Sequence, residues 1–194
     1  MNTQTHLLLA AAVLGRNMGP KGQAPKGQAT VLAGALVPDL SIFALAAFGL
    51  ATGLSGAQIW EEAYWAEPWQ TLSALSNSVP LWGAGLASSL ALGRRLPALF
   101  FAAGLLHLAF DLPLHAEDAH RHFWPLTDWR FRSPVSYWDP RHHGRIASAA
   151  EALGGLLLVT VLWRRHRARR VRAVLALTAL AYAAVPAFWL LSLG

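Results

Sequence analysis

The sequence predicts an all-α, polytopic helical membrane protein that forms a single membrane-embedded domain over residues 1–194, with about five or six apolar helices. Of its residues 55% are hydrophobic and only 13% are charged, and the mean hydropathy of +0.36 lies above that of typical soluble domains. Cysteine is absent. Disulfides and thiolate metal sites are therefore excluded, and any metal must be held by His, Asp or Glu.

The apolar runs predict helices over residues 5–15, 30–53, 80–93, 97–115, 146–163 and 171–193. Crossing a hydrocarbon core of roughly 30 Å takes about 20 residues, so two or three of these helices are long enough and the runs 5–15 and 80–93 are short. The first run lacks a basic flank and a cleavage site and is not expected to be a secretory signal. Residues 16–29, rich in Gly, Pro and Gln, are expected to form a loop.

Basic residues mark one side of the predicted bundle. Loops 16–29, 94–96 and 164–172 contain eleven of the sixteen Lys and Arg residues and no acid, whereas segments 54–79 and 116–145 contain most of the carboxylates. The positive-inside rule places the basic loops in the cytoplasm and the His-rich stretch outside. The net charge of +6 therefore indicates contact with membrane lipids and not with nucleic acid. The sequence also allows binding to a protein partner or formation of a homo-oligomer in the membrane.

Five ionisable residues interrupt the apolar runs, where each costs several kcal/mol unless it is paired, neutralised or bound to a cation. They are His6, Asp39, His107, Asp111 and Glu151. Three residues, His107, Asp111 and His115, stand at positions i, i+4 and i+8 of one predicted helix, so their side chains share one helix face. Such a face predicts a zinc or di-metal site. The alternative is that the same groups form hydrogen bonds between helices.

The outer segment 116–145 is aromatic and rich in histidine and arginine. Its histidines are expected at the surface or against lipid headgroups: His120, His122, His142 and His143. Three arginines are candidates for binding a substrate phosphate: Arg121, Arg130 and Arg132. The segment is predicted to be either an ordered lid or an interfacial belt of Trp, Tyr and Arg.

Three motifs carry a resemblance to a known family: "HLLLAAAVLG" (6–15), "GALVPDLSIF" (34–43) and "HLAFDLPLH" (107–115). Together they resemble the YdjM-like, or LexA-binding, family of metal-dependent hydrolases of the bacterial inner membrane. The resemblance implies His107 and Asp111 as ligands, with His6 and Asp39 added by position. Where that family often carries a histidine after its Pro-Asp motif, this chain has "SNSVPLW" (76–82).

A remoter similarity links the stretch from His107 to Glu117 to zinc-dependent phospholipases C and fungal zinc nucleases, although the interval before His115 is two residues shorter here. It implies an all-helical site that cleaves phosphoesters with zinc. The prediction is therefore a divalent-metal hydrolase, with zinc as the expected ion, acting on an ester or phosphoester of an amphiphilic substrate at the outer interface. Glu151 or Glu117 is the candidate base.

The main alternative is a non-enzymatic membrane assembly factor or subunit, in which the His and Asp side chains hold helices together. Transport of protons or ions is less favoured, because no acidic residues continue the polar path toward the basic side.

Overall fold

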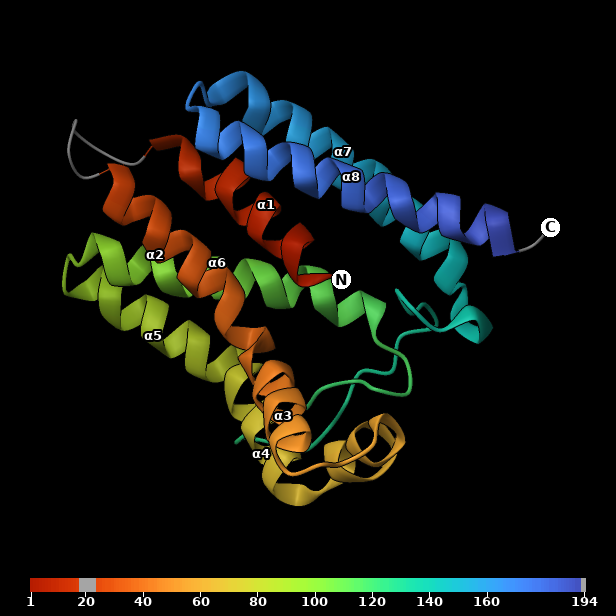
Figure 1. The fold of residues 1–194 in the computed structure, drawn as a ribbon. Helices are drawn as coiled ribbons and strands as arrows, with labels where there is room; N and C mark the ends of the chain where they lie inside the picture. The colour runs from red at the N-terminus through yellow and green to blue at the C-terminus, as the bar shows by residue number, and fades with distance from the viewer. Residues whose placement is uncertain (18–23, 193–194) are drawn as a thin grey trace.

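The computed structural model describes residues 1–17 and 24–192, and within that part every regular element is helical. This confirms the all-α prediction. The eight α-helices, shown in Figure 1, are α1 (Thr3–Val13), α2 (Ala24–Leu36), α3 (Leu40–Ala51), α4 (Glu67–Ser76), α5 (Val79–Ala91), α6 (Arg95–Asp111), α7 (Gly144–Arg165) and α8 (Arg169–Ser192). Helix α2 begins within the stretch expected to be a loop, of which residues 18–23 lie outside the described part.

Three segments among the described residues are long and apolar enough to cross a membrane: Lys26–Ala51, Arg95–Leu114 and Gly144–Arg165. Only 28–33% of the most apolar window in each is buried inside the protein. Exposed apolar surface on this scale is unusual for a monomer in water and is ordinary for helices that face lipid. The larger number of five or six apolar helices is not confirmed.

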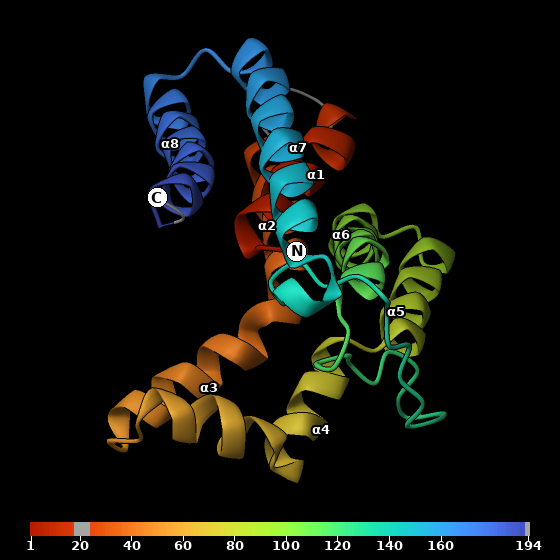
Figure 2. The ribbon, with the colours of Figure 1, turned by 90° about the vertical axis from the view of Figure 1, so that its right-hand side faces the viewer.

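The helix predicted over 30–53 is interrupted. A 3₁₀ turn at Val37–Asp39 separates α2 from α3, and Figure 2 shows α3 leaving the direction of α2. Pro38 lacks an N–H and its ring clashes with the preceding turn, so a straight helix cannot pass through it. The predicted helical run is therefore present but is bent at Pro38, and the bend places Asp39 between α2 and α3.

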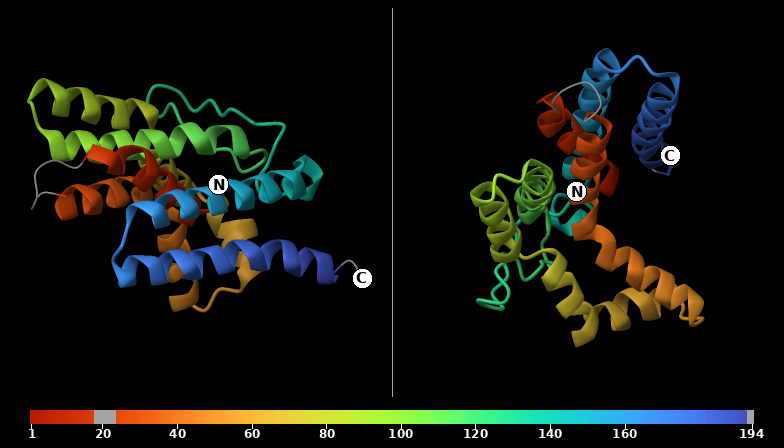
Figure 3. Two further views of the ribbon diagram at one scale, coloured as in Figure 1. Left: turned by 90° about the horizontal axis from the view of Figure 1, so that it is seen from above. Right: turned by 90° about the vertical axis from the view of Figure 1, so that its left-hand side faces the viewer.

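Helix α6 occupies the middle of the fold and packs against α2 and α5, while α1 packs against α2 and α7, and α7 against α8. The left panel of Figure 3 shows α5, α6, α7 and α8 lying roughly parallel to one another. Gly34 allows α2 to approach α6 closely, because a Cβ there would lie 2.1 Å from the carbonyl oxygen of Phe100. The close approach brings the carbonyl of Ala35 beside α6.

Two outer segments complete the fold. No helix was predicted within segment 54–79, but it contains α4, whose Leu72, Leu75 and Ser76 lie beside Leu40 and Ser41 at the start of α3. Residues 115–143 contain no α-helix and cross the end of α6 (Figure 1), where the N–H of Ser133 donates to the carbonyl of His115 (2.9 Å) and that of Tyr137 to Leu114 (3.0 Å). This segment is held against the end of α6.

Candidate metal centre

Three buried side chains form the first half of the site, here named the inner triad: His6 of α1, and His107 and Asp111 of α6. One ligand atom from each lies within 4.8 Å of the other two. The two imidazoles stack with centroids 3.5 Å apart and an interplanar angle of 8°. Helix α1 thus brings a second histidine to the α6 face that already carries one.

The ring of His107 is oriented by a main-chain group. Its Nδ1 lies 2.8 Å from the carbonyl oxygen of Ala35, and since a carbonyl only accepts, Nδ1 carries the proton and donates. The other nitrogen, Nε2, is buried and has no hydrogen-bond partner in the described residues. A fixed tautomer with a free nitrogen lone pair is the form in which histidine binds metals.

Asp39 approaches the inner triad from the bend after α2. Its Oδ1 lies 3.6 Å from Nε2 of His107, and its Oδ2 accepts a hydrogen bond of 2.7 Å from the hydroxyl of Thr3. The Asp39 carboxylate is therefore held by Thr3 of α1 and directed at the unpartnered Nε2 of His107.

The second half, here named the outer triad, consists of Asp111, His115 and His120, which also have ligand atoms within 4.8 Å of one another. Asp111 belongs to both triads. Its Oδ1 lies 3.2 Å from Nε2 of His6, and its Oδ2 lies 2.9 Å from Nε2 of His115. Oδ1 also accepts from the N-terminal ammonium of Met1 at 2.6 Å, so this carboxylate contacts an ammonium group and imidazoles of both triads.

The outer histidines differ in charge. Burial alone would lower the pKa of His115, but the carboxylates of Asp111 and Asp118 outweigh burial and raise that pKa to about 9. A cation held by the outer triad would therefore have to displace a proton from His115. Burial and the neighbouring His115 lower the pKa of His120 to about 3, so His120 is neutral at pH 7. Its Nδ1 lies 3.0 Å from the hydroxyl of Ser73 in α4.

The expectation that His120 and His122 lie at the surface was wrong, because both are buried. The segment turns inward at Ala116 and Ala119, whose small side chains are buried beside them at little cost in conformational entropy. These two alanines, beside histidines in an otherwise polar stretch, are the signal in the sequence that indicates the turn. His142 is partly exposed and lies 3.0 Å from Asp139.

The two candidate bases lie in different environments. Glu117 is exposed and forms an ion pair of 3.5 Å with Arg132, so it lies outside both triads. Glu151 is buried, and its Oε1 accepts hydrogen bonds from the N–H of Asn2 (2.7 Å) and the hydroxyl of Thr5 (2.5 Å). Glu151 is therefore tied to α1, one residue from His6.

The three arginines predicted to bind substrate already have protein partners. Arg121 donates to Glu67 and Asp128 at 3.1 Å each. Arg130 donates to the carbonyl of Ala119 (2.6 Å) and to Gln70 (2.9 Å). The contacts of Arg121 and Arg130 connect the outer segment to α4, whereas the partner of Arg132, Glu117, lies within the outer segment itself.

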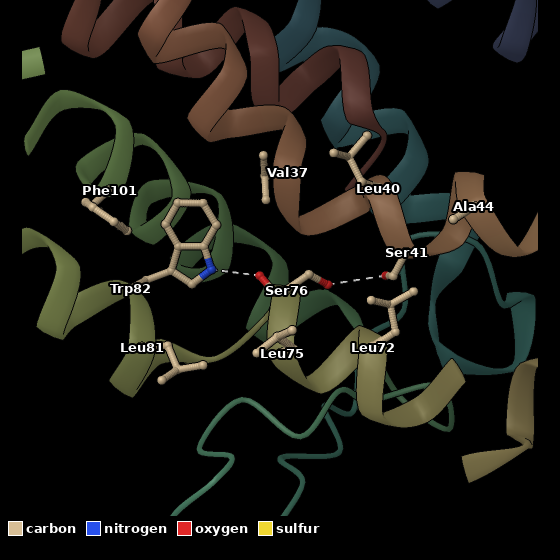
Figure 4. Close-up of a pocket in the computed structure, with 10 residues that line it drawn as sticks. All are labelled: Val37, Leu40, Ser41, Ala44, Leu72, Leu75, Ser76, Leu81, Trp82 and Phe101. Carbon is tan, nitrogen blue, oxygen red and sulfur yellow. Dashed lines mark hydrogen bonds between the residues drawn. The ribbon is translucent and has the colours of Figure 1, made fainter. Parts of the chain in front are cut away.

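Two cavities flank this region. The first, of about 430 Å³, lies among α3, α4, α5 and α6 and is apolar apart from two serine hydroxyls (Figure 4). There the indole N–H of Trp82 donates to the carbonyl of Ser76 (2.7 Å). None of the triad residues lines it. The second, of about 690 Å³, runs along α7 and includes Glu151 and Thr5 in its wall; the triad residues do not line it either, but Thr5 precedes His6.

Comparison of the chain with protein-family models, with curated proteins and with solved structures finds no match. The site therefore has to be interpreted from its own geometry. That geometry brings together all five predicted ligands, which are His6, Asp39, His107, Asp111 and His115. It also adds His120 to them. That they bind a metal stays a prediction.

Proposed function

We propose that this protein is a membrane-embedded hydrolase that depends on a divalent cation, with zinc as the expected ion, held by the inner and outer triads. The observation that carries the proposal is the buried Nε2 of His107, which has no hydrogen-bond partner in the described residues while Nδ1 is fixed by Ala35. A buried nitrogen without a partner is costly unless something binds it. The neighbouring donors are imidazole and carboxylate, which suit zinc.

A cation in this place would supply Lewis-acid activation of water and of an ester or phosphoester oxygen. The other roles belong to residues of the chain. His6, His107 and Asp111 would hold and orient the cation, and Asp39 would position His107. The segment 115–143 limits the access of bulk water from the end of α6. Glu151, and not the exposed Glu117, is the carboxylate retained as a candidate for contact with substrate.

The environment proposed is the bacterial inner membrane, with the segment 115–143 on the periplasmic side. The support is the separation of basic from acidic segments together with the three apolar segments. The YdjM-like resemblance belongs to the same proposal, since it depends on the same short motifs.

Elemental analysis of protein purified without added metal tests the proposal. Wild type should carry stoichiometric zinc, His107→Ala should lose it, and His166→Ala, the same change at the far end of α7, should keep it. Hydrolysis of bis(p-nitrophenyl) phosphate should stop with a chelator and return with zinc. Wild-type protein without metal, or equal zinc in His107→Ala, would refute the metal site.

A second function has its own support. Side chains of α1 bind three other elements, through Thr3 to Asp39, and through Thr5 to Glu151 and to Tyr182 of α8. An assembly factor or subunit in which these bonds fix the helices would be zinc-free and would unfold at lower temperature when they are removed.

A further inference from the structure

The second cavity, here named the lateral groove, lies between α7, α1 and the end of α6. Six of the residues that line it are large and apolar: Leu9, Phe110, Leu114, Ile146, Leu157 and Leu158. Ile146 and Leu157 are 70% and 65% exposed, and α7 is one of the candidate membrane spans. In a bilayer the open side of the groove therefore faces hydrocarbon.

One carboxylate lies in this apolar wall. Glu151 is 8% exposed, and its Oε1 is satisfied by Asn2 and Thr5. Since the Thr5 hydroxyl donates its single hydrogen to Glu151, the Tyr182 hydroxyl 2.5 Å away must donate to Thr5. The contacts to Oε1 are thus complete. Oε2 is buried and has no hydrogen-bond partner among the described residues.

A buried carboxylate oxygen without a donor is expensive. No described residue donates to Oε2, so a molecule in the groove is the remaining source of a donor. Water could use the polar groups of the wall, which are Met1, Thr5 and His143, but most of the lining is apolar and lies along a candidate membrane span, which favours a molecule with a hydrocarbon chain.

We propose that the lateral groove binds the hydrocarbon chain of a membrane lipid whose headgroup donates an N–H or O–H hydrogen bond to Oε2 of Glu151. This names the substrate class of the proposed hydrolase, and in that sense it rests on the proposed function. The site differs from the cavity of Figure 4, where hydroxyls are the polar side chains and no carboxylate is present.

The groove is long enough to hold most of one lipid chain. From Glu151, where the headgroup would bind, to Leu158 the groove follows α7 for about 10 Å at 1.5 Å per residue, against about 15 Å for one leaflet of the hydrocarbon core. Gly154 and Leu158 lie at i+3 and i+7 from Glu151 and share its helix face. The chain would therefore continue from Glu151 past Gly154 toward the middle of the bilayer.

Gly154 allows the groove to be filled without disturbing the protein, because a Cβ there meets no atom within 4 Å. Gly154→Leu should block the chain. Gly83→Leu is the matched control, since Gly83 of α5 is also open to added atoms and lies outside the groove. Ala150→Leu, at an exposed position on the groove wall, provides a second block in case the first variant does not fold.

The experiment is native mass spectrometry of protein extracted from vesicles of equal parts phosphatidylethanolamine, phosphatidylglycerol and phosphatidylcholine. The first two lipids have N–H or O–H donors and the third has none. Wild type and Gly83→Leu should retain the donor lipids about tenfold over phosphatidylcholine, the ratio that one hydrogen bond to a carboxylate supports. The blocked variants should lose bound lipid, and Glu151→Gln should keep it with less preference.

Equal retention by the blocked variants and wild type would overturn the proposal. Equal retention of all three lipids would also overturn the proposal and would identify water as the donor to Oε2 of Glu151. Zinc measured in the same samples separates the two proposals. Wild type that lacks zinc but retains lipid selectively would refute the metal site and support the lipid groove. Wild type that carries zinc but retains no lipid would refute the lipid groove and support the metal site.

Discussion

The imidazole rings of His6 and His107 lie in parallel contact, 3.5 Å apart, with the N–H of His107 donated to Ala35 of α2. Three helices are therefore needed to build this one contact. Because the carbonyl of Ala35 also fixes the tautomer of His107, the pair is held with Nε2 of His107 open for a ligand.

His107 and Asp111 should act as one unit, because residues four apart on a helix can reach the same ion. His107→Ala and Asp111→Ala are each expected to abolish most metal binding, and the double variant should be hardly worse, as measured by elemental analysis. If the groups only join helices, each change instead costs about 1 to 3 kcal/mol of stability with no metal lost.

His120 should contribute to the outer half of the centre alone. His120→Ala is expected to lower the zinc content less than His107→Ala does, because the inner triad, with the open Nε2 of His107, contains no residue of the outer segment. His142→Ala, a partly exposed histidine of the same segment, should keep full zinc. Unchanged zinc in His120→Ala would remove the outer triad from the site.

Asp139 should stabilise the start of α7 in a pH-dependent way. The guanidinium and backbone N–H of Arg141 hold the pKa of Asp139 below its usual 3.8, so the stabilisation is complete above that pH and is lost as the pH falls through the lowered value. Asp139→Asn should lower Tm at pH 7, and the difference from wild type should shrink in acid. A constant difference would show that the carboxylate charge is not involved.

The orientation can be tested by labelling single cysteines in a chain that has none. Thr127→Cys in the outer segment should react with an impermeant maleimide in intact cells, and Ala168→Cys between α7 and α8 only after lysis. Both sites are exposed, whereas Ser133 in the same outer segment is buried and unsuitable. The reverse pattern would invert the topology.

Neighbouring glycines in α7 should respond in opposite ways. Gly155→Ala places a Cβ 2.4 Å from the ring of Tyr182 and should cost about 1 to 3 kcal/mol through overpacking. Gly154→Ala meets open space and should stabilise by up to about 1 kcal/mol through helix propensity. Thermal unfolding in detergent measures both, and equal effects would contradict the packing of α7 on α8.

The sequence by itself determined the helical class and the apolar segments, because hydropathy and helix periodicity are local properties. It also determined that His107 and Asp111 share a face of one helix, since that follows from a spacing of four residues. The interruption after α2 could have been predicted as well, because Pro38 carries a local steric signal.

The tertiary structure alone decided which separate segments meet. His6 reaches His107 only because α1 packs beside α2, and Asp39 is directed at the same nitrogen only because the chain bends there. His120 turns inward and Glu117 outward within one loop, although both stand among polar neighbours. The physical reason is that burial in an irregular segment depends on contacts with distant elements, here α4 and the end of α6, and no periodicity in the sequence records such contacts.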